Sequence, residues 1–224
     1  MRRLIFLVVF GLGGAAILIS LGVWQVQRLA WKEDLLARID TEIAADPVAL
    51  TTDLGRYAPV SLTGVFDPDA GYIRVLASRK STGAVYRIIR PFQADGYGRV
   101  LVDTGWVPEA AGTLPQVPTG QITLVGNLDA PIEADSFTPV PDLDANIWFA
   151  RDVPAMARTL NTDPVLVVLR DAPDASLGVT PWPVDTAGIS NDHLQYAITW
   201  FSLSAIWLAM TAVFLRRGSA ANTS

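Results

Sequence analysis

The chain has 224 residues, half of them hydrophobic, a formal net charge of −5 and no cysteine. The acidic balance argues against nucleic-acid binding, and the lack of cysteine excludes disulfides and thiolate metal sites. The composition is too apolar for an ordinary soluble protein of this length, and two uncharged runs of 20 residues, 4–23 and 196–215, account for the excess.

Residues 4–23 are the first predicted element. A helix rises about 1.5 Å per residue, so this run spans about 30 Å, the thickness of the hydrocarbon core of a bilayer. Lipid offers no partner to free backbone groups, so the run is predicted to be a transmembrane helix. It is longer than the apolar part of a signal peptide and no small-x-small cleavage site follows it, so we expect an uncleaved anchor.

The first helix is expected to continue beyond the membrane. Trp31, Leu35, Ile39 and Ile43 recur every four residues, which places them on one helical face. The Asp46-Pro47 pair is predicted to end the helix.

The middle of the chain changes to a period of two, which is typical of strands. Strands are predicted at 57–66, 72–78, 84–92, 99–107, 121–128, 146–152 and 164–170. One short helix is predicted at 153–161, and loops are predicted at 111–120, 135–145 and 171–192. The predicted fold class is therefore two transmembrane α-helices flanking an extracytoplasmic α+β domain, mainly an antiparallel sheet or small barrel with a short helix.

The charges predict the orientation of the two spans. All 22 acidic residues and 13 of the 17 basic residues lie between the runs, and the other four are arginines at the chain ends. Positive charge favours the cytoplasmic side, so both termini are predicted to be cytoplasmic and the middle periplasmic. The predicted parts are a cytoplasmic N-terminus 1–3, spans 4–23 and 194–215, an exported domain 24–193 and a cytoplasmic tail 216–224.

Catalytic chemistry has little support in the sequence, so we expect that the protein is not an enzyme. A Ser-His-Asp site would need the only histidine, His193, with Asp192, but neighbouring helix residues face different directions. Residues 142–146 resemble the start of a calcium loop, yet Ile147 and Val153 stand where such a loop needs Gly and Glu.

Two groups of residues lie at the predicted outer membrane edge. In the first, Trp24, Arg28 and Trp31 share a helical face, with Gln25 and Lys32 beside it. Such residues commonly anchor a helix at the headgroups. They would also suit a large planar amphiphile that bears carboxylates.

The second group is a stripe down the second span, formed by His193, Tyr196, Trp200, Ser204 and Trp207. His193 stands at the outer end of the stripe. Taken alone, it is either a metal or haem ligand or a polar residue at the interface.

Small residues predict that the two spans are able to pair. Gly11 and Ala15 in the first span, and Ala205 and Ala209 in the second, are small-xxx-small pairs that permit close helix contact. If the helices pair, the His193 stripe is expected to face the Trp24 and Arg28 face and form a shallow pocket.

Five segments, taken in order between two terminal spans, resemble the surfeit locus protein family of cytochrome c oxidase assembly factors. They are residues 21–36, 60–67, 100–108, 146–152 and 193–204, and the resemblance covers about residues 20–205. One departure is Asp103-Thr104, which stands where the family usually has Asn-Arg.

The resemblance implies a membrane-bound factor that binds haem a and aids its delivery to the catalytic subunit of a haem-copper oxidase. It implies that His193 is the haem iron ligand. The other expected haem contacts are Tyr196, Trp200 and Trp24 on the macrocycle and Arg28 and Lys32 at the propionates. The implied partners are oxidase subunit I, the haem a synthesis machinery and membrane lipid, and the implied location is a bacterial inner membrane.

Two other functions stay open from the sequence. The protein could hold oxidase subunits together without binding a cofactor. It could also be a membrane-anchored periplasmic binding domain unrelated to respiration.

Overall fold

The computed structural model describes residues 2–112, 114, 117–171 and 177–220. Parts of two predicted loops (113, 115–116 and 172–176), the first residue and the end of the predicted tail (221–224) lie outside the described residues. The chain forms two compact units: unit 1 is Met1–Arg38 with Thr186–Ser224, and unit 2 is Ile39–Asp185.

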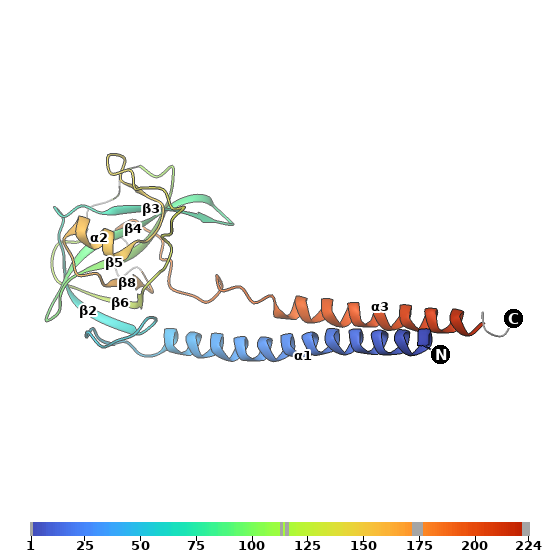
Figure 1. Cartoon of the computed structure of the whole chain (residues 1–224). Helices are drawn as coiled ribbons and strands as arrows, with labels where there is room; N and C mark the ends of the chain where they lie inside the picture. The colour runs from blue at the N-terminus through green and yellow to red at the C-terminus, as the bar shows by residue number, and fades with distance from the viewer. Residues whose placement is uncertain (1, 113, 115–116, 172–176, 221–224) are drawn as a thin grey trace. The chain divides into compact units, whose positions relative to one another are not determined.

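Unit 1 is a pair of antiparallel helices, α1 (Arg2–Ala44) and α3 (His193–Ala220), which lie side by side (Figure 1). Both helices are long and apolar enough to cross a membrane, which confirms the two predicted helices. The last residues of α1 belong to unit 2, and the helix ends just before Asp46-Pro47, as predicted.

The helices of unit 1 pack closely because α1 presents small residues. A Cβ added at Gly14 would lie 2.6 Å from the Trp207 indole nitrogen, and one at Gly22 would lie 2.7 Å from the Phe201 ring. A Cβ added at Gly11 would lie closer still to the Thr211 side chain, and Ala15, between these glycines in sequence, is buried. The predicted role of Gly11 and Ala15 is therefore confirmed.

The prediction for Ala205 and Ala209 is wrong, because both side chains are exposed on α3. The contact face of α3 instead includes Ala197, Ser204 and Thr211, which are spaced by seven residues. Residues spaced by seven lie along one line that faces a neighbouring helix over its whole length. A single pair spaced by four does not specify which face of the helix makes that contact.

Unit 2 contains eight strands and one short helix among its described residues. They are β1 (Val48–Ala49), β2 (Pro59–Phe66), β3 (Ile73–Arg79), β4 (Gly83–Ala94), β5 (Gly98–Pro108), β6 (Ile122–Asp129), β7 (Ile147–Trp148), α2 (Val153–Leu160) and β8 (Leu166–Leu169). Each predicted strand and the predicted helix are present. The strand predicted at 146–152 is shortened to β7 because the chain turns to begin α2, whose first turn is capped by Asp152.

Five strands of unit 2 close into a small barrel in the order β2-β6-β8-β5-β4, and β2 pairs with β4 to complete the ring. The closure needs glycine at Gly64, because an added Cβ would collide with the Gln93 carbonyl on β4. The barrel confirms the predicted fold class: most strand pairings are antiparallel, and the sheet is mixed because β5 pairs with β8, β1 with β2 and β3 with β7 in parallel.

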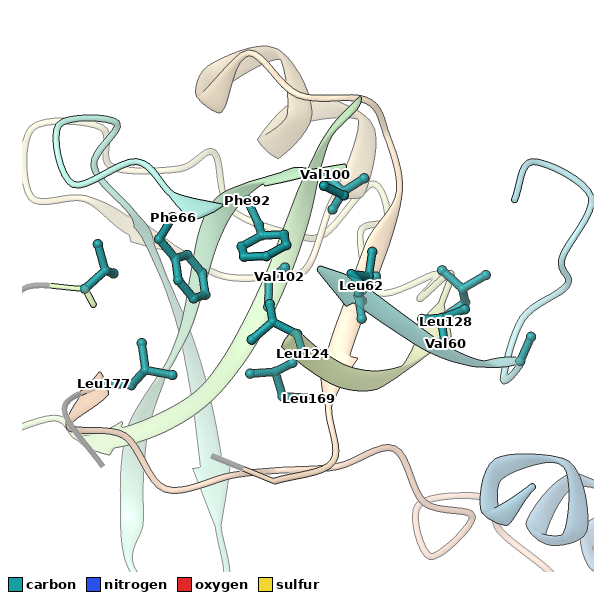
Figure 2. Close-up of a cluster of buried hydrophobic side chains, with 14 residues drawn as sticks. Val60, Leu62, Phe66, Phe92, Val100, Val102, Leu124, Leu128, Leu169 and Leu177 are labelled. Carbon is teal, nitrogen blue, oxygen red and sulfur yellow. The ribbon is translucent and has the colours of Figure 1, made fainter. Parts of the chain in front are cut away.

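Alternating side chains fill the barrel interior (Figure 2). On β2, Val60, Leu62 and Phe66 point inward, and the Phe66 ring meets the Phe92 ring edge to face at 4.9 Å between centroids. A second core lies between α2 and the barrel wall, where Met156 is fully buried. The barrel is therefore filled by its own side chains rather than hollow.

Candidate functional site

His193 is the first residue of α3, and its ring is held by α1 of the same unit. The His193 Nδ1 atom lies 2.8 Å from the Gln25 Oε1 atom. An amide oxygen only accepts hydrogen bonds, so Nδ1 is the donor in this contact, and in the neutral ring Nε2 then keeps a lone pair. Fixing one ring nitrogen in this way is how proteins orient an imidazole that binds a metal through the other.

Gln25 is placed at His193 by the helix packing. It is buried on the same face of α1 as Gly11, Ala15 and Gly22, which is the face that contacts α3. Polar burial of this kind needs a partner, and the His193 ring supplies it.

The structure brings Gln25, rather than the Trp24 and Arg28 face, to the His193 stripe. The Trp24 side chain is about half exposed, and the Arg28 guanidinium lies 4.2 Å from the centre of the Trp31 ring. Lys32 is partly buried, one turn beyond Arg28 on α1. The aromatic and cationic group is therefore a surface of α1, next to the buried Gln25.

The predicted stripe on α3 divides between the helix contact and the outer surface. His193, Trp200 and Trp207 are partly buried and Ser204 is buried, whereas Tyr196 is exposed. Trp207 donates its indole N–H to the Gly11 carbonyl at 3.0 Å. Tyr196 would contact a bound molecule only from the outer surface of α3.

Two buried polar atoms on α3 have no hydrogen-bond partner among the described residues, the Trp200 Nε1 and the Ser204 Oγ. Leaving such an atom unpaired costs about 1–3 kcal/mol. Trp200 lies seven residues, about 10 Å, along the helix from His193. The spacing of seven and eleven residues places both side chains on the same face of α3 as His193.

The histidine that begins α3 offers a single imidazole. No group of three or more His, Cys, Asp or Glu side chains able to hold an ion occurs among the described residues. A haem iron is already held by four ring nitrogens and needs only an axial protein ligand such as one histidine. His193 with a fixed Nδ1 and a free Nε2 fits that requirement.

The departure at Asp103-Thr104 lies in the interior of unit 2 rather than on its surface. Asp103 is fully buried, its Oδ2 lies 2.6 Å from the Arg87 Nε, and Thr104 donates its hydroxyl to the Ile88 carbonyl at 3.0 Å. Burial raises the pKa of the Asp103 carboxyl above its ordinary value, although Arg87 opposes this effect. The substitution therefore changes the polar core and not an exposed contact.

Two candidate membrane helices flank a small mixed barrel in the sequence, and the histidine that begins the second helix contacts a glutamine of the first. The model of the SURF1 family matches residues 12–205, and the chain belongs to this family. This membership confirms the resemblance predicted from the motifs.

Relatives from animals, a unicellular eukaryote and a bacterium agree with that assignment. The chain is 31% identical to surfeit locus protein 1 of Xenopus tropicalis, over 83% of this chain and 68% of the relative. It is 33% identical to a SURF1-like protein of Monosiga brevicollis, over 88% of this chain and 83% of the relative. It is 30% identical to a SURF1-like protein of Rickettsia felis, over 90% and 92%.

Sequence reasoning singled out His193 but missed the role of Gln25. The available signal was its spacing: Gly11, Ala15, Gly22 and Gln25 follow one another at intervals of four, seven and three residues. These intervals place all four on one face of a helix.

Proposed function

We propose that this protein is a membrane-bound assembly factor for haem-copper cytochrome c oxidase, and that it binds haem a through His193 and aids its delivery to the catalytic subunit. Membership of the SURF1 family implies the role in oxidase assembly. The observation that carries the haem proposal is the 2.8 Å contact between His193 Nδ1 and Gln25 Oε1, which leaves Nε2 available as an axial ligand.

The residues around His193 have distinct proposed roles. Trp200 and Trp24 supply aromatic surface, and Tyr196 adds to it on the outer side of α3. Arg28 and Lys32 supply the positive charge that pairs with propionate groups. When bound, haem a supplies the iron that the oxidase later uses in electron transfer.

One chain supplies a single imidazole, because His193 is its only histidine. A bis-histidine site within one chain is therefore excluded. The proposed complex is five-coordinate, or it takes its sixth ligand from water or from a partner chain. A sixth coordination position that is open or weakly bound suits a carrier that must release its haem.

The proposed location is the inner membrane of a bacterium, with both helices spanning it and both termini in the cytoplasm. The proposed partners are oxidase subunit I and the machinery that makes haem a. His193 then lies at the outer membrane edge, where it begins the second span.

Haem analysis of the purified protein tests this proposal. The full chain is purified in detergent from cells that make haem a, and its Soret band and extracted haem are measured. Stoichiometric haem a supports the proposal. If the purified protein is colourless and deletion of its gene still prevents the oxidase from accumulating, the result would instead support a scaffold that binds no cofactor.

A further inference from the structure

A loop of unit 2, residues 131–143, carries an unusual concentration of exposed apolar side chains. Ile132 is 94% exposed, Phe137 90%, Val140 86% and Leu143 66%. Single exposed apolar residues are normal on a protein surface, but four large ones within twelve positions are typical of an interaction site.

The loop is held in shape by its own hydrogen bonds. Asp135 Oδ1 accepts from the Phe137 N–H at 2.8 Å and from the Thr138 hydroxyl at 3.0 Å. At the far end, Asp142 exchanges two backbone hydrogen bonds with Ile147, at 2.8 and 2.9 Å. The apolar side chains are thus presented by an ordered loop, which lowers the entropic cost of binding.

A hollow of about 490 Å³ lies between this loop and α2. Its lining includes the apolar side chains of Val140, Leu143 and Phe149 and the Arg158 side chain of α2. Its volume is in the range of sites that accept a few apolar groups.

The charges around the loop decide what kind of occupant fits. Asp135, Asp142 and Asp144 form no ion pair with any described residue. Residues 39–185 as a whole carry 19 acidic and 10 basic residues, a net charge of −9. An anionic phospholipid surface repels such a domain, whereas a basic protein segment is attracted to it.

We propose that residues 131–143 and the adjoining hollow are a docking surface for a segment of another protein that presents apolar side chains next to lysine or arginine. Phe137 and Val140 are the anchors that the partner covers, and the aspartates pair with its basic residues. The proposal concerns protein recognition by unit 2 and does not depend on haem binding at His193.

Site-specific photo-cross-linking in native membranes tests the proposal. Phe137 is replaced by a photoreactive phenylalanine analogue, and Val65, an apolar residue on β2 that is also exposed, serves as the matched position. We expect position 137 to cross-link to one peptide of a different protein, with apolar residues and Lys or Arg close together, and position 65 not to do so. Cross-linking to phospholipid, to a second copy of this chain or to an acidic segment would overturn the proposal.

A binding measurement with a synthetic copy of the cross-linked peptide completes the test. The full chain in detergent should bind it, with affinity falling as salt rises from about 0.05 to about 0.5 M. The double variant Phe137→Ser, Val140→Ser should lose about tenfold or more in affinity, while Val65→Ser should bind like the wild type. Equal affinity of the double variant and the wild type would contradict the proposal. Because haem content is measured on the same samples, failure here is distinguishable from failure of the haem proposal.

Discussion

At the scale of single residues, the contact between His193 and Gln25 links the helix pair to the proposed chemistry. In the proposed site Gln25 is a positioning residue, which holds the His193 ring and does not itself bind the iron. Replacing it with leucine keeps similar bulk but removes the acceptor for the Nδ1 proton. The imidazole then loses both its fixed tautomer and its fixed orientation.

Gln25→Leu should therefore lower haem affinity about ten- to a hundredfold. Gln27→Leu is the matched control, since Gln27 is exposed on the same helix two residues further on. Affinity is measured by titrating haem into the purified full chain and following the Soret band. Identical haem affinities for Gln25→Leu and Gln27→Leu would show that Gln25 has no role in haem binding.

A second residue-scale prediction concerns the buried pair of Arg87 and Asp103. Arg87→Met leaves a buried carboxylate without its cation and should reduce the free energy of unfolding by about 3 kcal/mol. Arg99→Met is the control, because Arg99 pairs with Asp67 at the surface, where an ion pair contributes about 0–1 kcal/mol. Thermal unfolding of the full chain, followed by near-ultraviolet circular dichroism, measures both.

The pH dependence of the Arg87→Met variant follows from the raised pKa of Asp103. A carboxyl with a raised pKa in the folded state contributes stability at low pH, and this stability is lost as the pH rises through the folded pKa. The variant lacks Arg87, which opposes the shift, so it should regain stability as the pH falls below the folded-state pKa of Asp103 toward the ordinary value of about 4. If Arg87→Met loses the same amount of stability at every pH, the unpaired Asp103 carboxylate is not the cause of that loss.

At the scale of elements, close contact between α1 and α3 is the condition for the site. Gly14→Val would drive a side chain into the Trp207 indole and break its hydrogen bond to Gly11. Overpacking of this kind costs about 1–3 kcal/mol. Gly13→Val is the control, because no atom lies within 4 Å of a Cβ added there.

Cysteine cross-linking measures the pairing directly, since the native chain has no cysteine to interfere. Cysteines placed at Gly22 and Phe201, which touch across the pair, should be joined by a short bifunctional thiol reagent. The Gly14→Val change should slow this reaction, and Gly13→Val should not. Equal rates would show that the glycine contact does not control the pairing.

Much at the element scale was predictable from local pattern, and what was missed depends on distant partners. The alternation in Val60, Leu62 and Phe66 is a local signal and predicts an inward strand face. The closure of β2 on β4 and the parallel pairing of β8 with β5 are non-local, so the period of two does not specify them. Likewise, the stripe containing His193 was predictable from the sequence of α3 alone. The contact between His193 and Gln25 was not, because these residues are 168 positions apart in the sequence and meet only through the packing of the two helices.

At the scale of the whole molecule, the proposed function depends on which side of the membrane holds each part. The terminal arginines predict both ends in the cytoplasm and the barrel outside. A reporter active only in the periplasm should be active when inserted in the exposed loop at Gly112, and one active only in the cytoplasm should be active after Ser224. Cytoplasmic activity at Gly112 would place His193 at the opposite face and overturn the proposed site.

The haem content of His193→Ala, purified beside the wild type from cells that make haem a, tests the central claim most directly. Leu194→Ala is the control, because Leu194 is the exposed neighbour on the same helix turn. Alanine suits a helix end, so both variants should still insert in the membrane. We expect stoichiometric haem a in the wild type and in Leu194→Ala, and loss or sharp reduction of it in His193→Ala. The same haem content with an unchanged spectrum in His193→Ala would contradict the ligand assignment.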